Sequence, residues 1–263
     1  MIKQLRRTGM QQPKYKFYAT ILDSFWGYLN SGIIYQKYWG FSENPEHTEE
    51  EFQQKQFDEL INRINRVPFD NEKADRGTCF NELVDALIEN RKPNNVEVER
   101  IAGENDSLWY RAIYNKRTFV FPVSLCTEFS SYFQGALTQQ RVEAVLPTCF
   151  GDVLVYGLID ELMPMAVHDI KTTGNYYVGK FKDHFQHLVY PYALMQNGSD
   201  VRTFEYNIAE FNKGGFPVGT YTETYVFNPE RDIPILTSHC EMFIAFLEEN
   251  KDLITDKKIF GLE

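Results

Sequence analysis

The chain has 263 residues, 43% of them hydrophobic, and a formal net charge of −10. This length and composition describe a globular protein with ample material for a core, and they exclude a disordered tail. The acidic balance argues against a protein that coats nucleic acid non-specifically, so any contact with nucleic acid must be a local patch.

Four cysteines, Cys79, Cys126, Cys149 and Cys240, lie far apart and form no C-x-x-C pair. Zinc ribbons and iron–sulfur clusters take their ligands from such local groups, so this spacing predicts four free thiols in a reducing compartment. No apolar run reaches the roughly 18–20 residues that span a bilayer, and the N-terminal MIKQLRRTGMQQPKYK lacks the apolar region of a signal peptide. We therefore expect a soluble, cytoplasmic protein without a membrane partner.

The first half of the chain has the apolar period of helices. Its pattern predicts helices over residues 17–30, 47–67, 78–90 and about 121–137. Thr48 is followed by Glu51 at the spacing of a capping box, which marks the start of the second of these helices. Residues 92–107 have the most loop-like composition.

The apolar period then changes towards that of strands. Residues 140–173 predict three strands, with turns near 147–151 and 161–164. A helix follows over 179–198 and ends at Gly198, and two strands are predicted over 201–211 and 219–227. The chain closes with a helix that carries Leu236, Cys240, Phe243 and Leu247.

This order predicts a mixed α/β fold in one domain spanning 1–263. We divide it into a helical N-terminal part (1–75), a central part (76–230) and a C-terminal helix (231–263).

The segment VHDIKTT, residues 167–173, places an acid and a base at the end of an apolar strand. Successive strand side chains alternate between faces, so Asp169 and Lys171 should point the same way and Ile170 the opposite way. Another acid, Asp160, ends the preceding predicted strand. A hairpin between the two strands would bring Asp160 and Asp169 together at one end of the sheet.

Two carboxylates at close range repel each other unless a positive charge lies between them. A hard divalent cation such as Mg²⁺ or Mn²⁺ is the usual partner, and it binds through few carboxylates together with waters and substrate phosphate. A lysine beside the cation can stabilise negative charge on an attacked phosphate. Asp160, Asp169 and Lys171 are therefore the groups that metal-dependent phosphodiester hydrolysis needs.

Two helices add polar residues to this group. Gln186 and Tyr190 are four residues apart, so both face one side of their helix. Upstream, Asn81 and Glu82 lie on the polar side of the helix that begins near Gly77.

In this order the motifs resemble the PD-(D/E)XK nuclease superfamily, and most of all its branch of RecB-like and phage-type exonucleases. The resemblance covers roughly 76–196, and YATILDSFWGYLN matches the family's N-terminal helix. It implies a restriction-endonuclease-like mixed β-sheet core flanked by helices, with a helical N-terminal part. The family's eponymous proline is replaced by Ile159, as is common in that branch.

The resemblance also implies a role for each site residue. Asp160 and Asp169 would be metal ligands and Lys171 the catalytic lysine, while Gln186 and Tyr190 would position the lysine or the DNA backbone. The first-helix position of the family falls on Asn81 or Glu82. We assign Glu82 as the third metal ligand, because a carboxylate binds a hard cation better than an amide does. The cysteines do not match those of the iron–sulfur relatives, so no iron–sulfur cluster is implied.

Two classes of function stay open. The first is a metal-dependent DNA nuclease, in particular an exonuclease of recombination, repair or phage replication. The second is a catalytically inactive relative that binds nucleic acid or a protein partner. A zinc site made by His168, His184 and His187 with Asp160 is disfavoured, because His168 should point away from Asp169 and the other two lack a zinc-binding spacing.

Overall fold

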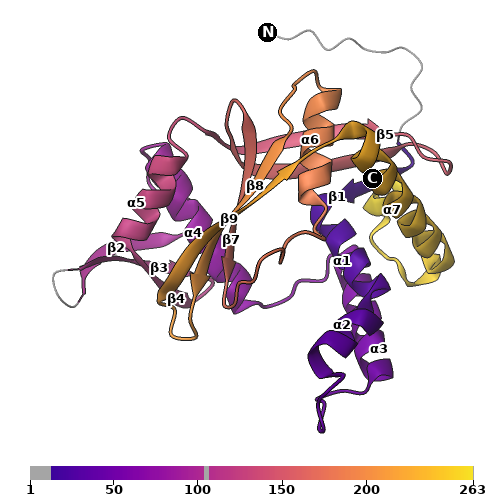
Figure 1. Cartoon of the computed structure of the whole chain (residues 1–263), viewed down its shortest axis with the longest axis horizontal. Helices are drawn as coiled ribbons and strands as arrows, with labels where there is room; N and C mark the ends of the chain where they lie inside the picture. Colours follow the sequence, from indigo (N-terminus) through magenta and orange to yellow (C-terminus); the bar gives the residue numbers. More distant parts are fainter. Residues whose placement is uncertain (1–12, 104–106, 263) are drawn as a thin grey trace.

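The computed structural model describes residues 13–103 and 107–262, and it is a mixed α/β protein in which helices flank a mixed sheet (Figure 1). The helices are α1 (Ala19–Leu29), α2 (Ser31–Trp39), α3 (Glu49–Ile64), α4 (Glu72–Ile88), α5 (Val123–Tyr132), α6 (Gln186–Gln196) and α7 (Pro229–Glu249), followed by the short 3₁₀ helices η2 (Lys251–Leu253) and η3 (Lys257–Phe260). The strands are β1 (Tyr15–Tyr18), β2 (Glu97–Ala102), β3 (Leu108–Tyr114), β4 (Arg117–Pro122), β5 (Leu137–Leu146), β6 (Val153–Leu162), β7 (Ala166–Thr173), β8 (Thr203–Phe211) and β9 (Pro217–Val226).

The strands form two sheets. The larger has the order β1-β6-β7-β8-β9, with β5 also paired to β6, and the smaller has the order β2-β3-β4. In the larger sheet β1 runs parallel to β6 and β7 runs parallel to β8, while the other pairs are antiparallel. The predicted mixed α/β class is confirmed.

One edge of β6 is left open in the middle of the strand. Along its other edge, β5 pairs with β6 from Val153 to Leu162. On the open side, β1 pairs with residues 153–156, and β7 pairs only with Glu161 and Leu162. Residues 157–160 on this edge therefore have no strand beside them in the described structure, and β6 and β7 separate directly after their hairpin.

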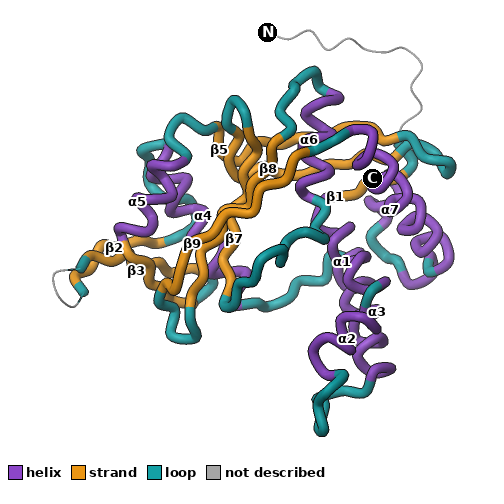
Figure 2. Tube along the Cα trace, in the orientation of Figure 1, coloured by secondary structure: helices purple, strands orange, loops and turns teal. Residues whose placement is uncertain are grey.

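Two apolar clusters lie on the two faces of the larger sheet. The first contains Phe25 of α1, Val189 of α6 and Phe243 of α7. The second contains Phe80 of α4 and the neighbouring side chains of α5, β3 and β4. Figures 1 and 2 show the same division, with α4 and α5 beside the small sheet and α1, α6 and α7 at the other side of the molecule.

Helix α3 begins as the sequence indicates. The Thr48 hydroxyl accepts from the Glu51 amide at 3.2 Å, and the Glu51 carboxylate accepts from the Thr48 amide at 2.9 Å. The predicted capping box is therefore confirmed at the start of α3. Within the described ranges, no helix has the length and apolar character needed to cross a membrane.

Several segments differ from the sequence-based expectation, and one is α4, which begins at Glu72 rather than near Gly77. Residues 15–18 form β1 rather than a helix start, because their pairing with β6 outweighs a four-residue local pattern. The expected loop at 92–107 contains β2 and the approach to β3, apart from residues 104–106, which lie outside the described residues. Most side chains of β2 are exposed, so this strand shows no apolar alternation to detect. The helix expected over 179–198 begins only at Gln186, because the Glu223 carboxylate binds the amides of residues 179–181 in a turn.

Candidate active site

Strand β7 presents the acid and the base on one face. Lys171 Nζ lies 2.6 Å from Asp169 Oδ2, while Ile170 points the other way into the second apolar cluster. The pair lies within the strand and not at its end, because β7 continues to Thr173 alongside β8. The Asp169 side chain is only 3% exposed, whereas 22% of the Lys171 side chain is open to solvent.

Gln186, the first residue of α6, joins the two charges. Its amide nitrogen donates to Asp169 Oδ1, and its amide oxygen accepts from Lys171 Nζ at 2.7 Å. The same nitrogen lies 3.3 Å from the Tyr190 hydroxyl, one turn further along the helix. Because an acid and a base each bind the matching end of the amide, its orientation is fixed.

Asp160 fills the gap where β6 and β7 separate. Its Oδ2 atom accepts from the backbone amide of Ile170 at 2.9 Å and from the Asn81 side-chain amide at 3.1 Å. The β6–β7 ladder has already stopped at Glu161, so the carboxylate takes the place of a ladder hydrogen bond. The side chain thus holds the two strands together beside Asp169.

The charges in this cluster interact strongly. Burial, and then the negative charge of Asp169, raise the pKa of Asp160 to about 8, against the opposing effects of Lys171 and the Ile170 amide. Burial lowers the pKa of Lys171, but the carboxylates of Asp169 and Asp160 outweigh it and the net direction is upward. The ionised form of Asp160 is therefore disfavoured, and a cation bound beside this carboxylate would stabilise it.

Glu82 does not lie with the two aspartates, and this corrects its assignment as a metal ligand. Its carboxylate binds the Arg91 guanidinium and the Asn94 amide, in the segment that follows α4. Successive helical residues point about 100° apart, so only one of Asn81 and Glu82 can face β6. That residue is Asn81, which donates to Asp160.

Two further acids lie next to this cluster, and the sequence motifs gave neither of them a role. Glu161 is fully buried, and burial followed by the charges of Asp160 and Asp85 raises its pKa to about 11. Burial also raises the pKa of Asp85 to about 6, while Gln139 donates to its carboxylate at 2.9 Å. The signal for Asp85 is its position one helical turn after Asn81.

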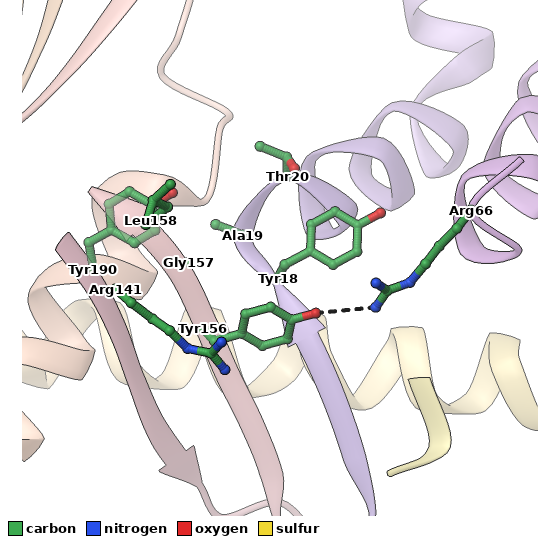
Figure 3. Close-up of a pocket in the computed structure, with 9 residues that line it drawn as sticks. All are labelled: Tyr18, Ala19, Thr20, Arg66, Arg141, Tyr156, Gly157, Leu158 and Tyr190. Carbon is green, nitrogen blue, oxygen red and sulfur yellow. Dashed lines mark hydrogen bonds between the residues drawn. The ribbon is translucent and has the colours of Figure 1, made fainter. Parts of the chain in front are cut away.

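A cavity of about 460 Å³ lies at the open edge of β6 (Figure 3). Figure 3 shows Tyr18 and Tyr156 in its wall, together with Tyr190, which also belongs to the cluster around Gln186. Gly157 allows this approach of Tyr190, because a Cβ atom at this position would lie 2.2 Å from the tyrosine ring. Arg66 also lines the cavity and donates to the Tyr156 hydroxyl at 3.4 Å.

A second cavity, of about 360 Å³, is lined by Lys171 itself. Asp23 of α1, Arg63 of α3 and His184 form other parts of its wall. Lys171 is therefore reachable from solvent through this cavity, whereas Asp169 lies behind it.

The donor atoms of the cluster fit a hard cation. Asp160 and Asp169 offer carboxylate oxygens, and the buried Oδ1 atom of Asn81 has no hydrogen-bond partner. An all-oxygen set of two carboxylates and an amide matches Mg²⁺ or Mn²⁺, which complete their coordination with water and phosphate. In residues 13–103 and 107–262, no three His, Cys, Asp or Glu side chains are arranged to hold a metal ion.

The histidines of the rival zinc hypothesis each have other partners. His168 Nδ1 lies 3.1 Å from Asn207 Oδ1, and His184 pairs with Asp23 at 3.3 Å. His187 stacks on Tyr225, with ring centroids 4.4 Å apart.

No family model matches the chain, and no curated protein matches it. One similar solved structure, described only as the crystal structure of SSO0001, has a TM-score of 0.37 and 8% sequence identity, covering 89% of this chain and 79% of the other.

Proposed function

We propose that this chain is a metal-dependent DNA nuclease that hydrolyses phosphodiester bonds on a restriction-endonuclease-like fold of the PD-(D/E)XK type. The observation that carries the proposal is the convergence of Asp160, Asp169 and Lys171 at the point where β6 and β7 separate. A structural ion pair alone would not require a second carboxylate with a pKa of about 8 beside it.

Each residue then has a defined task. Asp160 and Asp169 would hold Mg²⁺ or Mn²⁺, with the free oxygen of Asn81 beside them; such an ion activates water and neutralises charge on the phosphate. The ammonium group of Lys171 stabilises the negative charge that accumulates on the attacked phosphate. Gln186 keeps that ammonium group in place through its amide oxygen, and the Tyr190 hydroxyl contacts the nitrogen of the same amide.

The exonuclease assignment, with a role in recombination, repair or phage replication, rests on the resemblance to RecB-like and phage-type exonucleases. The partner would be DNA, and the setting the cytoplasm. An exonuclease needs a free end, so linear DNA should be degraded to short products while covalently closed circles survive.

The experiment compares labelled linear and closed-circular DNA, single- and double-stranded, with Mg²⁺, Mn²⁺ or EDTA. We expect release of short products from linear DNA with either metal and no products in EDTA. Equal nicking of circles would make the protein an endonuclease. If no substrate is cut with either metal, the proposal fails and the alternative of an inactive relative, a nucleic-acid- or partner-binding module, replaces it.

A further inference from the structure

A third cavity adjoins the one that Lys171 lines and has a different chemical character. Its volume is about 640 Å³, and α1, α2 and the loop of residues 174–185 form its walls. We name this cavity the strand groove. It shares Asp23, Gly27 and His184 with the cavity that Lys171 lines, so the two cavities adjoin at these residues.

The wall of the strand groove is directly connected to the elements of the candidate active site. The loop of residues 174–185 starts after β7, which carries Lys171, and ends at α6, which begins with Gln186. The loop that lines the groove is therefore held at its two ends by the elements that carry Lys171 and Gln186.

The lining combines aromatic faces with lysine side chains. Tyr38 and Tyr177 are 59% and 42% exposed. Lys37 lies between them, with its Nζ atom 4.5 Å from the Tyr177 ring centroid and 5.6 Å from that of Tyr38. Among the described residues, neither Lys37 nor Lys182 forms an ion pair with a carboxylate.

Lys180 is the third lysine of the groove, and it is bound to the Thr173 hydroxyl at 2.6 Å. Two acids accompany the lysines. Asp23 is engaged with the Phe185 amide and His184, and Asp183 lies near Lys37. The three lysines outnumber the two acids, so the groove is positive within a chain of net charge −10.

We propose that the strand groove binds an unpaired strand of DNA and leads it to Lys171, an inference that rests on the proposed nuclease function. In duplex DNA the base faces are stacked inside, whereas an unpaired strand exposes them to aromatic side chains. Tyr38 and Tyr177 stack on bases, and Lys37 and Lys182 contact phosphates. The substrate class is therefore DNA with a single-stranded end.

The test measures binding in EDTA, where no cleavage occurs, by the fluorescence anisotropy of labelled DNA. One duplex is blunt, and two others carry a single-stranded tail at the 5′ or the 3′ end. The wild-type chain should bind a tailed duplex more tightly than the blunt one. In Tyr38→Ala/Tyr177→Ala, Kd for the tailed duplex should rise on the order of thirtyfold or more, because two base–aromatic stacks are lost.

Matched variants separate stacking, charge and folding. Tyr38→Phe/Tyr177→Phe should retain tight binding, because the rings remain. Lys37→Gln/Lys182→Gln should make the negative slope of log K against log salt shallower by about 1.4, for two lost single-strand phosphate contacts. Tyr132→Ala/Lys213→Ala is the control, since Tyr132 is 53% exposed and neither residue lines the groove.

The outcomes distinguish this inference from the proposed function. Equal losses for blunt and tailed duplexes, or no binding of any DNA by the wild-type chain, would overturn the inference. Unchanged DNA binding in both groove variants would also overturn it and would leave the groove as a surface for a polypeptide. If tail binding depends on the groove but nothing is cut with Mg²⁺ or Mn²⁺, the inference stands and the nuclease proposal fails.

Discussion

At the scale of single residues, Lys171 is the group whose removal tests the chemistry most directly. It is held by Asp169 and by Gln186, and its side chain lines a solvent-connected cavity. We expect Lys171→Ala to lower kcat by on the order of 10²–10³ while KM changes little, because the charge acts mainly in the transition state. Steady-state cleavage of linear DNA measures this.

The fold and metal binding should survive this substitution, which circular dichroism and calorimetry can verify. Lys213→Ala, at an exposed lysine in the turn between β8 and β9, is the control and should cleave DNA normally. Equal kcat values in the wild type and Lys171→Ala would remove the lysine from the mechanism.

The two aspartates give a second residue-scale prediction. Mn²⁺ binding measured by calorimetry should be lost in Asp160→Asn/Asp169→Asn, because the amide oxygens are weaker ligands for a hard cation. Asparagine is preferable to alanine at position 160, since it can still accept from the Ile170 amide. Undiminished Mn²⁺ binding would place the metal site elsewhere.

His187 gives a prediction for pH. Burial lowers its pKa in the folded chain to about 4, below the value of about 6.5 in an unfolded chain. The unfolded state therefore binds more protons between these values, and the free energy of unfolding falls as the pH is lowered from 6.5 towards 4. By pH 5 the loss should be on the order of 1–2 kcal/mol.

Urea denaturation at pH 7.5 and pH 5 measures this effect. His187→Phe keeps a ring to stack on Tyr225 but cannot be protonated, so its stability should fall less over the same range. Parallel losses in the two chains would show that other groups cause the acid sensitivity.

At the scale of elements, the rotation of α4 decides which of its residues faces the site. Asn81→Asp would add a third carboxylate beside Asp160. We expect it to lower Tm in EDTA, because the carboxylates repel each other, and to tighten Mn²⁺ binding for the same reason. Thermal melts with and without Mn²⁺ measure both effects.

Glu82→Gln is the matched control on the next residue of the helix. It weakens the pairing with Arg91, so it should reduce stability without changing Mn²⁺ affinity. If Glu82→Gln altered Mn²⁺ binding while Asn81→Asp did not, the placement of α4 against β6 would be contradicted.

The elements also show what the sequence could and could not predict. Alternation along β7 correctly placed Asp169 and Lys171 on one face, because the strand period depends only on local geometry. The four-residue spacing correctly put Gln186 and Tyr190 together. The choice between Asn81 and Glu82 depends on how α4 packs against β6, which no local pattern predicts. Strands β1 and β2 form through pairing with other strands, so their own residues do not predict them.

At the scale of the whole molecule, β8 connects the two apolar clusters. Ile208 belongs to the first cluster and Phe211 to the second. We therefore expect one cooperative unfolding transition. Ile208→Ala should destabilise it by about 2–5 kcal/mol and Phe211→Ala by about 3–5 kcal/mol, through loss of buried contacts.

Two probes test this cooperativity. In Trp26→Phe/Trp39→Phe the remaining indole is Trp109 of β3, which reports on the small sheet, while far-ultraviolet circular dichroism reports on all helices. The two urea curves should coincide, before and after either β8 substitution. Separate midpoints would mean that the two clusters unfold independently.

The hydrogen bond from the Ile170 amide to Asp160 has an evolutionary consequence. A descendant that abandoned cleavage could lose Lys171 together with its partner Asp169, because in the described structure neither side chain binds a backbone amide. Position 160 would not have this freedom, since an apolar residue there would leave the Ile170 amide without its acceptor, at a cost of about 1–3 kcal/mol. Inactive descendants should therefore be recognised first by a changed residue 171, and should keep Asp or Asn at 160 long after their chemistry is gone.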